Sequence, residues 1–212
     1  MTEFPPSRRS GPERGALELE EAEHPRARDV GGGAPLGTPA PRPRVAIACE
    51  ATGWRRAFPH PFSFLREVAC QAVIGSGRAS PTGVDEVSLL LTDDAHQRDL
   101  NSQWRGIDSP TNVLSFPDGS PLPDGGRLLG DVVLALDTCR REAREQGKSL
   151  ADHTAHMVVH GVLHLLGFDH EEAEEAAVME SLEVRLLAAM GIADPYAEGL
   201  AAPRGEGQPE SG

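Results

Sequence analysis

The sequence predicts an α/β (α+β) domain in which a small mixed four-stranded sheet packs against about five helices. Short apolar, partly β-branched segments alternate with segments whose apolar residues recur at helical spacing, and the chain after the last short segment is helical. Histidines also cluster near the end of one late helix. These histidines place a candidate metal site on that helix and the turn that follows it.

The first half of the domain is expected to alternate strand and helix. Residues 44–50 and 86–92 are short, apolar and partly β-branched, so both are predicted strands. Between them, residues 61–74 carry apolar side chains at helical spacing, and glycines follow as a stop. A second helix, over about residues 93–103, opens on two aspartates, because acidic side chains favour the positive end of a helix.

Two further strands are expected in the middle of the chain. Residues 111–116 form the first, and Pro117 is expected to end it because proline cannot donate a hydrogen bond to a neighbouring strand. A loop rich in proline and glycine then covers residues 118–126. Residues 127–136 are the partner strand, so this part of the chain predicts a pair of adjacent strands.

The remainder of the domain is expected to be helical. The first of three helices covers residues 137–146 and ends at Gly147. The second covers residues 149–166, with Ser149 as its N-cap. The third covers residues 171–190, and a glycine again follows its end. These three helices complete the layer that packs on the sheet.

Composition sets the expected domain boundaries. Residues 1–43 are crowded with Pro, Gly, Arg and Glu and cannot bury enough apolar surface to order themselves, so they are expected to be a disordered N-terminal extension. Residues 198–212 are expected to be a disordered C-terminal tail, leaving a folded domain over residues 44–197. Neither a signal-peptide core nor a membrane span is evident, which predicts a cytoplasmic protein.

Charge and cysteine usage narrow the function classes. The net charge of −13 argues against a broad nonspecific nucleic-acid surface, which needs a basic patch. Arginines upstream of the acidic last helix could still form a locally positive face for a phosphate-bearing substrate. Cys49, Cys70 and Cys139 are odd in number and far apart, which indicates buried small hydrophobes in a reducing compartment.

The segment from His160 to His170 carries the clearest chemical signal. His160 and His164 are four residues apart on one helical face, so both can reach one ion. Gly167 can supply the turn that returns His170, since glycine accepts the left-handed backbone that ends a helix. Three neutral nitrogens would hold a zinc-type ion and leave a fourth position open, which is typical of hydrolytic sites.

One position separates this segment from the long zinc-protease motif, His-Glu-x-x-His-x-x-Gly-x-x-His. Gly161 stands where that motif has glutamate. That glutamate is the general base that deprotonates the zinc-bound water, so a peptidase mechanism has lost its proton acceptor here. Different chemistry on a similar metal cradle is the favoured interpretation.

Two stretches together resemble one family. Residues 110–117 read Pro-Thr-Asn-Val-Leu-Ser-Phe-Pro, and residues 160–170 read His-Gly-Val-Leu-His-Leu-Leu-Gly-Phe-Asp-His. Both resemble the hallmark motifs of the YbeY family, the bacterial zinc endoribonucleases of rRNA maturation. The resemblance spans about residues 45–196. It departs at Phe168, where the family usually has Tyr, and at Ile107, where a Lys is common, which weakens expectations about substrate contacts.

The resemblance implies a set of site residues. It implies one Zn²⁺ per chain on His160, His164 and His170, and it makes Arg105 the matching essential arginine of the cleft. A guanidinium offers a fixed fork of donors that can hold a scissile phosphate and offset charge on its oxygens. From the residues alone, Arg105 could also be a surface arginine or cap the preceding helix.

Other polar residues have weaker assignments. Thr111, Asn112 and Ser115 could line the cleft and bind substrate, or be turn and edge residues. His156 shares the helical face of His160, but a fourth imidazole would close the coordination sphere, so it is expected to pack behind the ligands. The remaining histidines are expected to be solvated, and two aspartates are left unassigned: His24, His60, His96, His153, Asp131 and Asp169.

The predicted function is a zinc-dependent, single-strand-specific endoribonuclease acting in rRNA 3′-end maturation and ribosome quality control. Its expected partners are an rRNA precursor and the ribosomal subunit or ribosome-associated proteins, with no membrane. Two alternatives stay open. One is a metallopeptidase lacking the usual glutamate base, and the other is a non-enzymatic ribosome-assembly factor in which zinc only staples the helix to its turn.

Overall fold

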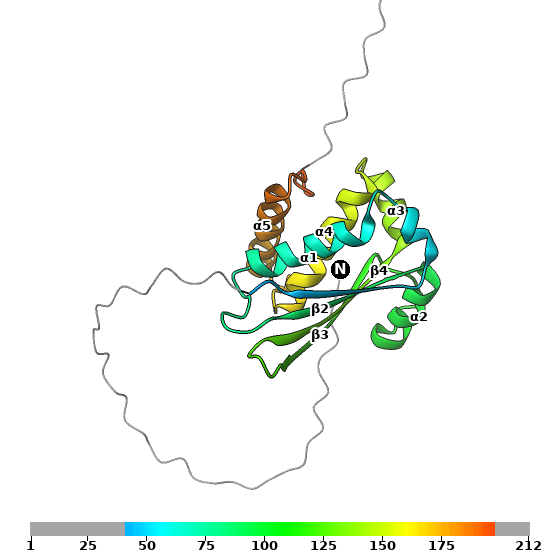
Figure 1. Ribbon diagram of the computed structural model, residues 1–212. Coiled ribbons are helices and arrows are strands. Elements are labelled where there is room, and N and C mark those ends of the chain that lie inside the picture. The colour runs from blue at the N-terminus through cyan, green and yellow to red at the C-terminus, as the bar shows by residue number, and fades with distance from the viewer. Residues whose placement is uncertain (1–40, 198–212) are drawn as a thin grey trace, which may run out of the picture. The chain divides into compact units, whose positions relative to one another are not determined.

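A four-stranded mixed sheet forms the centre of the part of the chain that the computed structural model describes, residues 41–197 (Figure 1). Its strands are β1 (Arg44–Cys49), β2 (Glu86–Thr92), β3 (Val113–Pro121) and β4 (Arg127–Ala135), in the spatial order β1-β2-β4-β3. β1 and β4 run parallel to β2, whereas β3 pairs with β4 antiparallel. The expected mixed four-stranded sheet is confirmed.

Five α-helices surround the sheet, as predicted. They are α1 (Pro61–Gly75), α2 (Asp94–Arg105), α3 (Leu136–Glu145), α4 (Leu150–Leu165) and α5 (Ala173–Ala189). Ser149 is the expected N-cap of α4, because its hydroxyl accepts a hydrogen bond from the amide of Asp152 at 3.0 Å. The expected extension (1–43) and tail (198–212) lie outside the described residues, apart from positions 41–43.

One local prediction was wrong, and one short element was not predicted. β3 does not stop at Pro117 but continues to Pro121 with a change of register, and much of the expected loop is therefore strand. Proline is tolerated there because β3 is an edge strand, where a missing donor leaves no neighbour unpaired. The sequence also gave no sign of a short 3-10 helix, Thr52–Arg56, which forms around the fully buried Trp54. The indole of Trp54 donates to the carbonyl of Thr92 at 2.9 Å.

The helices lie on both faces of the sheet. α1 packs against β1, and α4 packs against β3, β4 and α1 (Figure 1). α5 contacts α4 and α1, while α2 packs on β4 and α3. Ser115 of β3 reaches α4, and its neighbour Phe116 touches α2. Because successive side chains of a strand point to opposite faces, α4 and α2 flank β3 from the two sides of the sheet.

Gly161 lets α4 approach the sheet closely. A Cβ at this position would lie 2.7 Å from the Val132 Cγ1 of β4 and 3.0 Å from the Ser115 Oγ of β3. The same contact brings the Ser115 hydroxyl within 3.2 Å of the Gly161 carbonyl, to which it donates. Residue 161 therefore points at the sheet and not at the neighbouring histidines.

Gly161→Ala is expected to destabilise the fold. Alanine is favoured over glycine inside a helix by about 1 kcal/mol, but overpacking a filled core costs about 1–3 kcal/mol, so we expect a net loss of up to about 2 kcal/mol in the free energy of unfolding. Urea denaturation measures it. Val132→Ala removes the clashing methyl, so the double variant should be less destabilised than the two single losses added together. Strict additivity would show that this contact does not limit residue 161.

All three cysteines are free thiols. Cys70 and Cys139 are buried, and burial raises the pKa of each thiol, so neither is suited to nucleophilic chemistry. Cys49 is half-buried. Within residues 41–197, every helix is too short or too polar to cross a lipid bilayer.

Candidate metal centre

The C-terminal end of α4 and the turn after it bring the three predicted histidines together. Gly167 adopts a left-handed φ of 78°, as its predicted role requires. The Gly167 amide donates to the His164 carbonyl at 3.0 Å, and the Phe168 amide donates to the Leu163 carbonyl at 3.1 Å. These two bonds close the helix in a Schellman motif, and the reversed chain carries His170 back toward α4.

The three imidazoles form one cluster. One ring nitrogen from each of His160, His164 and His170 lies within 4.8 Å of the others. The ring centroids of His160 and His164 are 4.5 Å apart, and the ring of His170 stacks on that of His160 at 5.5 Å. His164 is buried, whereas His160 and His170 are partly exposed. The predicted ligand set is therefore assembled, with one side buried in the protein and the other accessible.

The Nδ1 atoms of His160 and His164 are hydrogen-bonded in a way that leaves their Nε2 atoms available to bind a metal ion. The Nδ1 of His160 lies 2.8 Å from the Glu183 Oε1, and the Nδ1 of His164 lies 3.1 Å from the Phe168 carbonyl oxygen. Both partners are acceptors, so each Nδ1 carries the proton and each Nε2 presents a lone pair. The two Nε2 atoms face one another at 3.1 Å. Nitrogens bound to one tetrahedral zinc are separated by about 3.3 Å, so a cation fits between them.

Burial disfavours protonation of His164. Together with the neighbouring imidazoles of His160 and His170, it lowers the pKa of His164 to about 3. A neutral imidazole is the form that ligates a metal ion. His164 is therefore in its ligand form at neutral pH.

Glu183 of α5 orients the centre from behind. Its carboxylate is fully buried and accepts hydrogen bonds from His160, from the His156 Nε2 at 3.0 Å and from the Tyr196 hydroxyl. Burial raises the pKa of Glu183, but the bonds from His156 and His160 outweigh it and lower the pKa to about 2. Burial and the adjacent carboxylate raise the pKa of Tyr196. His156 lies behind the ligands, where the sequence analysis placed it.

Glu183→Gln is expected to weaken metal binding roughly 10-fold to 100-fold, the scale lost when a partner of a ligating histidine is changed. The Glu183 carboxylate accepts hydrogen bonds from three donors. A glutamine amide would turn its NH₂ group, which is itself a donor, toward at least one of them, and that hydrogen bond would be lost. Competition with a chromophoric chelator measures the affinity. Glu180→Gln removes the same charge from an exposed position of α5 and serves as the control. Equal affinities in the two variants would argue against the orienting role.

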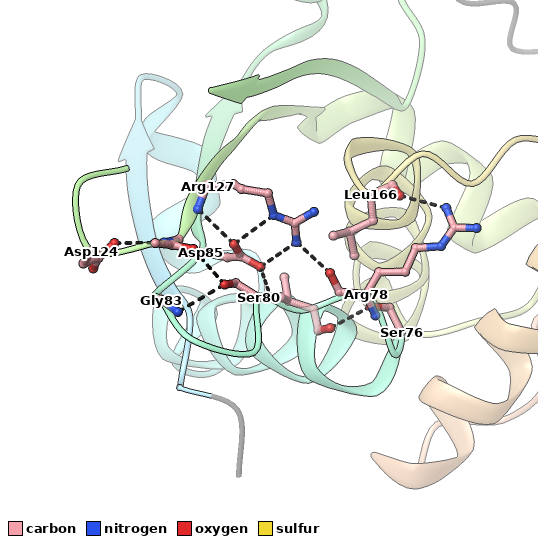
Figure 2. A network of polar contacts seen from close by, with 11 residues as sticks. Ser76, Arg78, Ser80, Gly83, Asp85, Asp124, Arg127 and Leu166 are labelled. Carbon is pink, nitrogen blue, oxygen red and sulfur yellow. Dashed lines mark hydrogen bonds and ion pairs between the residues drawn. The ribbon is translucent and has the colours of Figure 1, made fainter. Parts of the chain in front are cut away.

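The turn that carries His170 is also held by Arg78, from the segment between α1 and β2 (Figure 2). Its guanidinium donates to the Leu166 carbonyl at 2.9 Å and lies 3.7 Å from the centre of the Phe168 ring. The Arg78 carbonyl accepts from Arg127 at 2.6 Å, and Arg127 pairs with the buried Asp85 at 2.9 Å (Figure 2). These contacts tie the turn to the sheet.

The other predicted site residues lie on α2, on β3 and in the segment between them. Arg105 is the last residue of α2 and is half-buried. Ser115 bonds to α4 next to His160. Asn112 instead contacts α3: its amide nitrogen donates to Glu142 at 2.9 Å. The Thr111 hydroxyl donates to the Asn112 side chain at 3.4 Å. Of these four residues, Ser115 is hydrogen-bonded to the helix that carries the ligands.

The expectation that His153 is solvated was wrong. Its side chain is fully buried, and its Nε2 lies 2.9 Å from the Glu142 carboxylate. It lines a cavity of about 500 Å³ between α3, α4 and the segment after α5, together with His156 and Tyr196. The sequence analysis assigned no role to Glu183 or to Tyr196. The available signal was a charged residue among the apolar side chains of the last helix.

A mixed sheet covered by helices, with three imidazoles gathered at the end of one of them, defines a protein whose histidine cluster could hold a metal ion. Residues 64–191 match the model of the family described as Endoribonuclease YbeY. The chain belongs to this family, as the motif resemblance implied.

Similar proteins share this description. The chain is 51% identical to the Endoribonuclease YbeY of Paramagnetospirillum magneticum over 162 residues, which cover 73% of this chain and 96% of the relative. It is 47% identical to that of Methylocella silvestris over 160 residues, covering 76% and 89%. The solution structure of TM1509 from Thermotoga maritima matches with 23% identity and a TM-score of 0.43, over 69% of this chain and 91% of that one.

Proposed function

We propose that this chain is a zinc-dependent, single-strand-specific endoribonuclease that acts in the cytoplasm, in rRNA 3′-end maturation and ribosome quality control. The observation that carries the proposal is the cluster of three imidazoles whose outer nitrogens are fixed by Glu183 and by the Phe168 carbonyl. Membership of a family described as an endoribonuclease supports RNA as the substrate. An rRNA precursor and the ribosomal subunit are the proposed partners.

The chain's own residues divide the work of hydrolysis. His160, His164 and His170 would hold the zinc ion, and the partly exposed side of the cluster leaves room for a substrate oxygen. When bound, zinc supplies Lewis acidity toward a phosphate oxygen or a water molecule. Glu183 keeps the His160 ring in one orientation. Arg105 is the proposed catalytic residue that holds the scissile phosphate and offsets charge on its oxygens.

The metallopeptidase alternative is disfavoured by the packing of Gly161. The glutamate base of zinc proteases would have to stand at this position, but even a Cβ would lie 2.7 Å from Val132. A longer side chain would also point at β4 rather than at the histidines. Residue 161 therefore does not serve as a general base, first because it is glycine and second because the packing leaves no space for a longer side chain.

The structural-zinc alternative is disfavoured by the ligand count. Structural zinc sites are closed by four protein ligands, whereas catalytic sites use three and keep one position open. Within residues 41–197, the cluster supplies three nitrogens, two of them on partly exposed side chains. A centre of this kind suits hydrolysis better than it suits a purely structural metal site.

Metal analysis together with an RNA cleavage assay tests the proposed function. Purified full-length protein should contain about one zinc per chain and should cut a single-stranded RNA that carries an rRNA 3′ end. Chelation should stop cleavage, and zinc should restore it. Peptide cleavage without RNA cleavage would favour the peptidase. Metal loss that unfolds the chain, with no cleavage in the loaded state, would favour the assembly factor.

A further inference from the structure

One large aromatic side chain is exposed without an evident role in the fold. The chain has two tryptophans, and Trp54 is fully buried with its indole donating to the Thr92 carbonyl. Trp104, on the last turn of α2, is 53% exposed. Tyr196 is also partly exposed, but its hydroxyl bonds to Glu183. Trp104 therefore has free ring surface that neither the core nor the metal centre explains.

The ring of Trp104 is held in place. It makes an edge-to-face contact with Phe116 of β3, with ring centroids 5.8 Å apart and planes at 63°. The chain beyond it is fixed as well: Gly106 ends α2 with a left-handed φ of 71°. Arg98 then holds Asp108 through two hydrogen bonds of 2.6 and 2.7 Å. A rigid aromatic surface binds a partner at little cost in side-chain entropy.

Trp104 is connected to the metal centre through the edge strand. Phe116, which it touches, is the neighbour of Ser115, and Ser115 bonds to the carbonyl of Gly161 beside His160. Because β3 has no strand on its outer side, a flexible polymer could pass from one face of the sheet to the other around it. Trp104 and the metal centre therefore flank the same edge of the sheet.

We propose that Trp104 is a stacking platform for an unpaired base of the RNA substrate. Aromatic rings on single-strand-binding proteins stack on bases regardless of sequence, because every base has a π-face. In a duplex both faces of each interior base are already covered, so a platform of this kind selects single strands. The inference rests on the proposed function and adds the surface that would recognise the unpaired substrate.

Intrinsic fluorescence tests the platform directly. Stacking of a base should quench Trp104, whereas Trp54 lies in the core and should not respond. The full-length protein is titrated with oligouridylate, at a temperature at which a gel shows the RNA intact after the titration. We expect saturable quenching with oligouridylate and little with the oligouridylate–oligoadenylate duplex. Quenching that persists in Trp104→Phe, or equal quenching by the duplex, would overturn the proposal.

Three substitutions separate stacking from packing. Trp104→Phe should keep RNA affinity within a few-fold, since the ring remains, while Trp104→Leu and Trp104→Ala should weaken binding roughly 5-fold to 100-fold. Leucine keeps an apolar contact with Phe116, so a melting temperature near that of the unsubstituted chain shows that its fold is intact. Val178→Ala, at an exposed position of α5, is the matched control and should bind RNA normally. Unchanged RNA affinity in Trp104→Leu would overturn the proposal.

Failure of the platform and failure of the proposed function give different results. Quenching without RNA cleavage would keep the platform and reject the nuclease. Cleavage with no quenching, at the same rate in Trp104→Ala, would keep the nuclease and reject the platform. If this face instead joins two copies of the chain, Trp104→Ala would lower the mass in sedimentation and RNA would not quench the ring. That outcome would also overturn the proposal.

Discussion

Replacing His160, His164 or His170 with alanine is expected to remove the metal ion and to reduce RNA cleavage to background. Each imidazole supplies one of the three clustered nitrogens, and two ligands hold a zinc-type ion poorly. Loss of the ion should lower the rate by at least about three orders of magnitude, because metal polarisation of the phosphate or water is lost with it. Zinc content by mass spectrometry and cleavage of labelled RNA measure the two effects.

Two other histidines provide controls for this prediction. His156→Ala should retain the metal with weaker affinity, since it removes one donor to Glu183 but no ligand. His96→Ala should change neither metal content nor cleavage rate, because His96 lies on α2 and pairs with Glu50, the residue after β1. If the three ligand variants kept their metal, the cluster would have to be reassigned. Full metal with no activity would instead point to a role in chemistry rather than coordination.

The sequence predicted the sheet, the helices and the three imidazoles because each depends on local pattern. Strands and helices follow from apolar periodicity, and the ligands follow from a four-residue spacing closed by Gly167. The continuation of β3 past Pro117 could not be predicted, because whether proline is tolerated depends on which strand lies at the edge. Strand order is a tertiary property that a local pattern does not contain.

The parts of the site that were missed depend on partners distant in sequence. Glu183 bonds to His160 across 23 positions, and the buried His153 is satisfied by a hydrogen bond from its Nε2 to Glu142 of α3. Neither pair has a fixed spacing that a sequence could display. Gly161 is different: the missing glutamate was visible in the sequence, but its steric cause, Val132, became clear only from the packing of α4 on β4. Ligands were therefore easier to predict than the residues that orient them.

Arg105→Ala is expected to reduce RNA cleavage by about two or more orders of magnitude while leaving fold and zinc content intact. A loss of that size is about 2.7 kcal/mol or more in transition-state stabilisation. As the last residue of α2, Arg105 also places a cation at the negative end of the helix, which is worth about 0.3–1 kcal/mol. The loss of transition-state stabilisation should therefore exceed the loss in the free energy of unfolding. Single-turnover cleavage measures the first and urea denaturation the second.

Arg105→Lys should recover only part of the lost rate. Lysine restores the charge and the favourable helix end but not the planar fork that holds a phosphate through two bonds. Arg140→Ala, which removes a cation from a surface pair with Asp137, is the control and should cleave normally. The imidazole cluster and the guanidinium are proposed to act on the same phosphate. Substitution in either one should therefore be enough to impair cleavage. Near-normal cleavage by Arg105→Ala would exclude it as the phosphate-holding residue and move that role to Ser115, whose hydroxyl already lies against the ligand helix.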